Sequence, residues 1–174
     1  MGGAEPEEPD DGPDGDPVQV AREIALRQLT VRSRTVQELR TALARRNVPD
    51  EAAEEVLARF GEVGLVDDAA FARDWVAAGP RRLRSRRVLA QELKSRGVAA
   101  ELVTEALDDL DPEAEFEVAR SLARKRLPGL AGLDPQARYR RLAGALARRG
   151  FAGPVVHAVL REVLADEVPE LETE

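Results

Sequence analysis

Three similar stretches decide how this chain folds: LRTALARRNV at residues 39–48, LAQELKSRGV at residues 89–98 and LAGALARRGF at residues 142–151. Each contains two leucines four residues apart, followed by a basic residue, a turn-forming residue and an apolar residue. Leucines at this spacing lie on one face of a helix, and glycine or asparagine suits the left-handed turn that ends a helix. One amphipathic segment precedes each stretch and another follows it. The sequence therefore predicts three units of three helices each.

We expect an all-α fold of three tandem three-helix repeats in an elongated, curved array. A unit of about 50 residues buries little apolar surface alone, so neighbouring units should stack. Aspartate followed by proline at residues 16–17, 111–112 and 134–135 predicts three helix starts, and the insertion LPGLAGLDP at residues 127–135 is expected to form an extended loop. The predicted segments are a disordered acidic tail (1–16), three repeats (17–66, 67–111 and 112–165) and an acidic C-terminal tail (166–174).

Charge is unevenly distributed along the 174 residues. The chain has 33 acidic and 26 basic residues and a net charge of -7, but residues 1–20 hold seven acids and residues 165–174 hold five, with no base in either. Residues 21–164 therefore carry 21 acidic and all 26 basic residues. A basic body between acidic ends favours a polyanionic partner.

The composition excludes many kinds of chemistry. The chain has no cysteine and one histidine, so it lacks the residues for a disulfide, a zinc–thiolate site or a pair of catalytic histidines. We find no glycine-rich phosphate loop and no nucleophile motif. We expect no enzymatic activity, no metal and no cofactor. The apolar stretches are too short to span a membrane and none resembles a signal peptide, which predicts a soluble, cytoplasmic protein without membrane partners. We separately expect a monomer.

Basic residues concentrate in the second and third repeats, on the flanks of the leucine pairs, and we expect them to form a binding face for phosphates or an acidic protein groove. Tyr139 is included because it sits among arginines, whereas the other aromatic residues are spaced as core residues. We interpret His157 as structural and Asp67-Asp68 as a helix cap. The predicted face comprises Arg82, Arg86, Arg87, Lys94, Arg138, Tyr139, Arg141, Arg148 and Arg149.

The chain resembles the RecX family of bacterial recombination regulators. The resemblance rests on the run from Leu29 to Val76, on VLAQELKSRGV (88–98) and on LARRGF (146–151), and it covers residues 20–165. The chain departs from the family pattern in two turns: LRSR (83–86) stands where many members have a glycine-containing turn, and Asn47 replaces a glycine. Asparagine tolerates a left-handed backbone, so only the path of the loop at residues 79–85 is in question.

The resemblance implies an all-helical protein that binds the RecA recombinase and its single-stranded DNA filament. By this resemblance the chain would inhibit the recombinase, ATPase and coprotease activities of RecA, and so modulate homologous recombination, DNA repair and the SOS response. It would also imply that Phe71, Trp75, Leu93, Gly97 and Val98 belong to the scaffold. Direct binding to DNA is a further possible interaction.

Two other functions fit the residues. Helix–turn–helix pairs rich in arginine are typical of regulators that bind duplex DNA, which would bind a specific sequence without any recombinase. A generic helical-repeat adaptor, whose bases serve solubility, would show no preference for a nucleoprotein filament.

Overall fold

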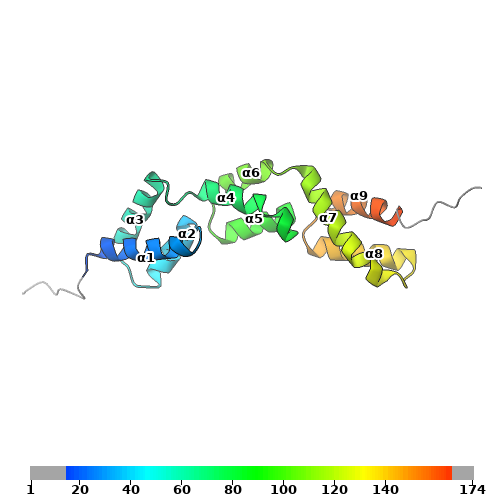
Figure 1. The fold of residues 1–174 in the computed structure, drawn as a ribbon, viewed down its shortest axis with the longest axis horizontal. Helices are drawn as coiled ribbons and strands as arrows, with labels where there is room; N and C mark the ends of the chain where they lie inside the picture. Colours follow the sequence, from blue (N-terminus) through cyan, green and yellow to red (C-terminus); the bar gives the residue numbers. More distant parts are fainter. Residues whose placement is uncertain (1–14, 166–174) are drawn as a thin grey trace, which may run out of the picture. The chain divides into compact units, whose positions relative to one another are not determined.

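The structure is a computed structural model that describes residues 15–165. Both predicted acidic tails therefore lie mainly or wholly outside the described residues. Within residues 15–165 the chain forms α-helices, two short 3-10 helices and turns, without a strand, which confirms the predicted all-α fold (Figure 1). The elements are α1 (Pro17–Val31), α2 (Val36–Ala44), α3 (Asp50–Glu62), α4 (Asp68–Ala77), η1 (Pro80–Arg82), α5 (Arg86–Ser95), α6 (Ala100–Asp108), α7 (Pro112–Arg126), η2 (Leu127–Leu130), α8 (Pro135–Arg148) and α9 (Gly153–Ala165).

Helices α1, α7 and α8 begin where aspartate precedes proline. The carboxylates of Asp16, Asp111 and Asp134 each accept a hydrogen bond from a backbone N–H in the first turn of α1, α7 and α8. These caps satisfy N–H groups that have no partner within the helix, and proline at the first helical position lacks an N–H that would need one. All three predicted helix starts are confirmed.

The paired leucines of the repeat form the centre of each apolar core. All six have 2% or less of their surface exposed: Leu39, Leu43, Leu89, Leu93, Leu142 and Leu146. Full burial of a leucine side chain contributes about 1.5–3 kcal/mol. The repeated pattern in the sequence thus marks positions with the same role in all three repeats.

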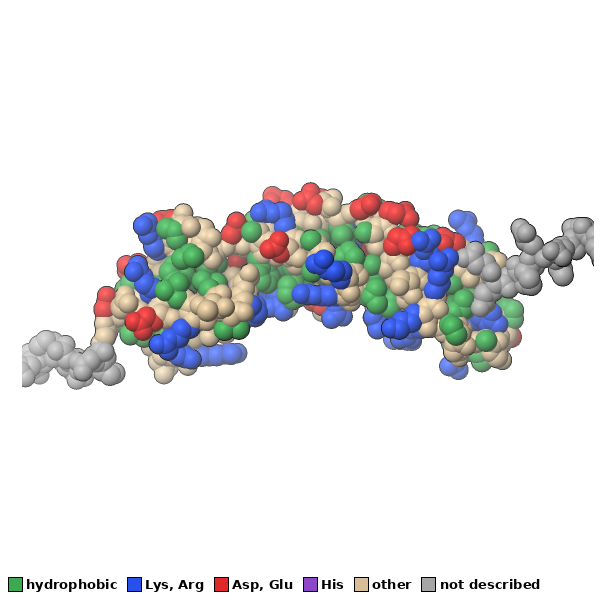
Figure 2. Space-filling model, in the orientation of Figure 1, with side chains coloured by type: hydrophobic (Ala, Val, Ile, Leu, Met, Phe, Trp, Pro, Cys, Tyr) green, Lys and Arg blue, Asp and Glu red, His purple; other side chains and the backbone are tan. Residues whose placement is uncertain are grey.

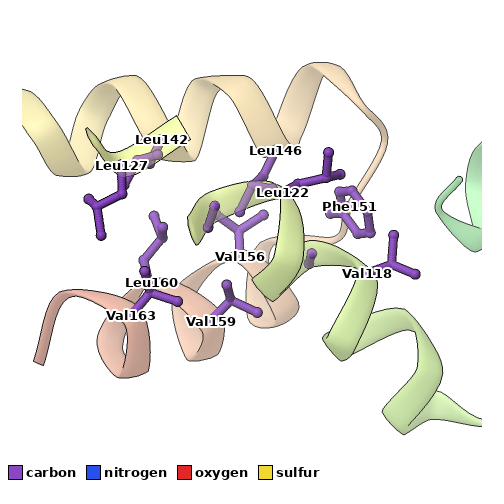
Figure 3. Packing of buried hydrophobic residues seen from close by; sticks show 12 residues of the cluster. Val118, Leu122, Leu127, Leu142, Leu146, Phe151, Val156, Val159, Leu160 and Val163 are labelled. Carbon is purple, nitrogen blue, oxygen red and sulfur yellow. The ribbon is translucent and has the colours of Figure 1, made fainter. Parts of the chain in front are cut away.

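The chain divides into two compact units. One contains residues 15–34 and 38–66, in which α1 packs against α3; the other contains residues 35–37 and 67–165. In the second unit, α4, α5 and α6 enclose one core that includes Phe71, Val76 and Val103. Helices α7, α8 and α9 enclose another, in which side chains from all three helices meet (Figure 3).

The insertion in the third repeat is not the extended loop that the sequence predicts. Leu127 continues from α7 into the 3-10 helix η2, and a turn then leads to Asp134, which caps α8. Leu127 is 9% exposed and Leu130 packs against the same core, so apolar contacts fold the insertion onto the repeat. The glycines and prolines of the insertion favour a loop, but the packing of these two leucines outweighs that preference.

The turns between the second and third helices of the repeats share a left-handed backbone. Asn47 has φ of 57°, Gly97 of 80° and Gly150 of 85°, as the sequence predicts. Leu83, in the loop that departs from the family pattern, also has a positive φ of 54°. This conformation is unfavourable for a bulky residue, and the Leu83 side chain packs against the core of the third repeat. That packing offsets the cost of the backbone conformation.

Candidate basic interface

Two equivalent contacts within the second unit, which we call the first and second junctions, lie beside several of the basic residues. In the first junction, the hydroxyl of Thr35 donates to the carbonyl of Arg96 at 2.6 Å. In the second junction, the hydroxyl of Ser85 donates to the carbonyl of Arg149 at 2.8 Å. Both hydroxyl residues are fully buried, and each lies just before a helix, α2 or α5. In each contact a buried hydroxyl of the second unit thus binds the carbonyl that precedes a left-handed glycine.

The second junction brings together basic residues that are 62 positions apart in the sequence. A Cβ atom on Gly150 would lie 3.6 Å from the Cβ of Arg87, so the start of α5 lies against the turn that follows α8. Arg87, Arg148 and Arg149 are exposed, and within residues 15–165 their side chains form no ion pair or hydrogen bond. These three predicted residues are available to an external anion.

Two of the predicted contact residues instead stabilise the protein itself. The guanidinium of Arg86 donates to the carbonyl of Leu110 at 3.1 Å and lies 3.7 Å from a carboxylate oxygen of Asp108. Arg138 donates to the carbonyls of Ala131 and Leu133, which fixes the turn between η2 and α8. Both side chains are half-buried. Their positive charge serves local structure in the described chain.

A second group of basic residues surrounds Trp75. The guanidinium carbons of Arg82 and Arg96 lie 4.5 and 4.1 Å from the centre of its ring, and the indole N–H donates to Glu92 at 3.0 Å. Trp75 also stacks on Phe71. Cations over an aromatic face are attracted by its negative π-surface. The predicted face includes Arg82 and leaves out Arg96, because only the folded turn after α5 places Arg96 over the ring.

The remaining predicted residues lie on exposed surfaces of α5 and α8. Lys94 occupies the last turn of α5, where a cation interacts favourably with the helix dipole. Tyr139 is 37% exposed, and its hydroxyl lies 3.4 Å from Nδ1 of His157. Arg141 is exposed and lines a cavity together with Arg148. The exposed position of Tyr139 sets it apart from the buried rings of Phe71 and Phe151.

Charge separates to opposite edges of the second unit. Figure 2 shows basic side chains along the edge formed by α5 and α8, and acidic side chains along α6 and the start of α7. Exposed acids on that edge include Glu101, Glu105, Asp109 and Glu113. An anionic partner would therefore be attracted to one edge and repelled from the other.

Other basic residues have carboxylate partners. Hydrogen bonds to Glu162 and then to Glu117 raise the pKa of the Arg120 guanidinium above its ordinary value. In the first unit, a hydrogen bond from Arg40 lowers the pKa of the Glu54 carboxyl. Each of these pairs neutralises its own charge at the surface. They contrast with Arg87, Arg141 and Arg149, which have no carboxylate partner among the described residues.

The acidic pair Asp67-Asp68 acts as a cap, as predicted. Asp67 accepts from the N–H of Ala70, and Asp68 accepts from the N–H of Val36 at 2.9 Å. Across residues 15–165, no group of three histidine, cysteine or acidic residues is placed to hold a metal ion. No helix in that range is long and apolar enough to cross a membrane.

The three repeats match three family models in order. Residues 21–60 match the first three-helix domain of RecX, residues 67–107 the second and residues 113–160 the third. The chain belongs to the RecX family. RecX proteins are regulatory proteins and not enzymes, which agrees with the expectation that the chain has no catalytic activity.

Relatives with the same description cover nearly all of this RecX-family chain. A regulatory protein RecX from Streptomyces coelicolor is 47% identical over 161 residues, which are 92% of this chain and 86% of the relative. The RecX of Mycolicibacterium smegmatis is 42% identical over 175 residues and covers 92% of both chains.

Solved structures share the fold. The crystal structure of RecX from Lactobacillus salivarius has a TM-score of 0.81 at 17% identity and covers 86% of this chain and 98% of its own. A second crystal structure of a regulatory protein RecX has a TM-score of 0.77 at 24% identity and covers 83% of this chain and 73% of its own. At these identities the structures support the fold alone. The family assignment rests on the sequence matches.

Proposed function

We propose that this RecX-family chain binds RecA and the RecA filament on single-stranded DNA, and that it inhibits the recombinase, ATPase and coprotease activities of RecA. The observation that carries the proposal is the set of exposed arginines without carboxylate partners at the second junction, Arg87, Arg148 and Arg149. A nucleoprotein filament presents both phosphates and acidic side chains, and guanidinium groups bind either one through paired hydrogen bonds.

The mechanism that fits is physical obstruction. Helices α5 and α8 present basic residues from two successive repeats along one edge, while the opposite edge is acidic (Figure 2). Such a protein would bind with the basic edge toward the filament and contact several RecA subunits or phosphates at once. It would then restrain the subunit movements linked to ATP hydrolysis, and no catalytic residue of its own is needed.

The test is DNA-dependent ATP hydrolysis by RecA from the same organism, titrated with this chain. We expect inhibition well below one molecule per RecA subunit, because one bound molecule would affect several subunits. The double variant Arg87→Gln/Arg149→Gln should need a several-fold higher concentration for the same inhibition. The control Arg73→Gln/Arg161→Gln removes the same charge from exposed arginines elsewhere on α4 and α9 and should inhibit as the native chain does.

Two results would contradict the proposal. If the native chain neither inhibits hydrolysis nor binds the filament, the RecA function is wrong for this chain, and sequence-specific binding to duplex DNA would favour the regulator of that class instead. If both double variants inhibit equally, the filament contact lies away from the second junction. Helicity by circular dichroism should be unchanged in both variants, since these are exposed substitutions.

A further inference from the structure

We propose that a cavity in the third repeat is a phosphate-binding site that takes one nucleotide, either free or within a single strand. The inference goes beyond the proposed function because it concerns the chain alone and needs no RecA. The cavity has a volume of about 630 Å³, and four arginines line it: Arg126, Arg140, Arg141 and Arg148. Only Arg141 and Arg148 of these belong to the basic face that the sequence predicts.

The insertion in the third repeat builds one wall of this cavity. Gly129 and Leu130 of η2 face α8, and Ala137 and Leu142 from α8 complete the apolar part of the lining. The insertion that interrupts the alignment of the repeats therefore supplies part of the site. Cavities of roughly 300–1,000 Å³ with an apolar lining and a few polar groups are typical of small-ligand sites.

The arrangement of charge indicates an anionic ligand. The lining contains no acidic residue, and within residues 15–165 these four side chains form no ion pair or hydrogen bond. Arg126 and Arg148 lie in the last turns of α7 and α8, where the helix dipole favours a cation. That explanation does not extend to Arg140 and Arg141, which lie in the middle of α8. Four neighbouring positive charges repel one another, and a bound anion would relieve that repulsion.

A nucleotide satisfies both parts of the lining. Guanidinium groups bind phosphate oxygens through paired hydrogen bonds, and this geometry favours arginine over lysine. The partly exposed side chains of Leu130 and Ala137 offer an apolar surface for a base or sugar. An acidic peptide would supply single carboxylates and would leave the apolar surface without a flat partner, so we favour the nucleotide.

The test measures binding to the full chain without RecA, by fluorescence anisotropy, with two probes: ATP carrying a fluorescent label on its ribose and a labelled twelve-nucleotide oligothymidylate. We expect at least one probe to bind, with affinity that falls as salt rises from 50 to 200 mM. Arg140→Gln/Arg141→Gln should weaken binding by about tenfold or more. The control Arg73→Gln/Arg161→Gln should change it less than about twofold, and Arg140→Lys/Arg141→Lys should restore part of the affinity by restoring charge alone.

The outcomes separate the two sources and decide the proposal. Binding of labelled ATP indicates a free nucleotide, whereas binding of the oligothymidylate alone indicates a nucleotide unit within a strand. The proposal is overturned if neither probe binds below about 1 mM, if Arg140→Gln/Arg141→Gln binds as the control does, or if polyglutamate displaces the probe at equal charge concentration. Should RecA inhibition persist when the probes fail to bind, the inference alone falls and the proposed function stands.

Discussion

The two junctions of the second unit share a backbone arrangement but differ in charge. In both, a buried hydroxyl donates to the carbonyl beside a left-handed glycine: Thr35 to Arg96 next to Gly97, and Ser85 to Arg149 next to Gly150. Each contact depends on a hydroxyl residue on one side of the junction and a glycine on the other. The hydrogen bond itself thus joins two uncharged groups.

Each junction also has a carboxylate that accepts from the first backbone N–H of the helix, and the exposed residue that follows differs in charge. At the first junction the backbone N–H of Val36 donates to Asp68. At the second, the N–H of Arg86 donates to Glu115 at 3.0 Å. Gln37 at the first junction corresponds to Arg87 at the second, 50 residues later. The comparison teaches that one backbone arrangement can recur within the second unit while the exposed charge beside it, and with it the capacity to bind an anion, changes from junction to junction.

The largest expected effect comes from adding a methyl group at the glycines. A Cβ on Gly97 would lie 2.3 Å from the Cβ of Gln37, and one on Gly150 would lie 2.8 Å from Oγ of Ser85. Gly97→Ala and Gly150→Ala should each lower the free energy of unfolding by roughly 2–5 kcal/mol, the sum of the left-handed backbone and the steric conflict. Urea unfolding followed by circular dichroism measures this.

Gly64 provides the control for that comparison. It also has a positive φ, of 72°, but a Cβ there would meet no atom within 4 Å. Gly64→Ala should cost only the backbone part, about 1–2 kcal/mol. If all three variants lose the same stability, the close contact at the junctions contributes nothing, and the account of the two glycines is wrong.

The next effect tests the hydroxyls. Thr35→Val keeps the shape of the side chain and Ser85→Ala shortens it, and each leaves a carbonyl, of Arg96 or Arg149, without its donor. We expect a loss of about 1–3 kcal/mol for each, since both hydrogen bonds are partly buried and an acceptor left without its donor costs more than the bond itself contributes. Trp75, the only tryptophan, lies in the second repeat, so its fluorescence during unfolding reports on this region. A loss below about 0.3 kcal/mol in both variants would mean that the hydroxyls do not hold the junctions.

Neighbouring arginines at the second junction separate structure from binding. Arg86→Ala removes the hydrogen bond to Leu110 and should cost about 0.5–1.5 kcal/mol, because the side chain is only partly buried. Arg87→Ala should change stability by less than about 0.5 kcal/mol, since its side chain is exposed. Thermal unfolding of the two variants provides the measurement. The distinction fails if Arg87→Ala is the more destabilising of the two.

The fold could be predicted from the sequence because its signals are local. Leucines four residues apart, aspartate–proline pairs and left-handed turn residues each act within one helix or turn, and the structure places helices and cores at those positions. The junctions could not be predicted, since the bond from Thr35 to Arg96 spans 61 residues and that from Ser85 to Arg149 spans 64. No sequence pattern within one helix predicts a contact between residues so far apart in the chain.

The candidate site was only partly predictable for the same reason. A count of basic residues treats Arg86 and Arg87 alike, although one donates to Leu110 and the other faces solvent. The predicted face also leaves out Arg126 and Arg140, which line one cavity only when η2 folds against α8. Charge can be read from the sequence, but whether that charge already has a partner depends on tertiary structure.

The smallest effect on stability, and the sharpest test of the comparison, comes from making the first junction resemble the second. Gln37→Arg keeps the Cβ and Cγ atoms that lie closest to the position of a Cβ on Gly97, and it changes only the exposed end of the side chain. Stability should therefore change by less than about 0.5 kcal/mol. The added charge should lower the concentration needed to inhibit RecA ATP hydrolysis about twofold. Arg87→Gln removes a charge and should raise that concentration about twofold. Opposite shifts in the two variants at equal stability would mean that charge at the junctions governs binding independently of packing, whereas no shift in either would confine the role of both junctions to the fold.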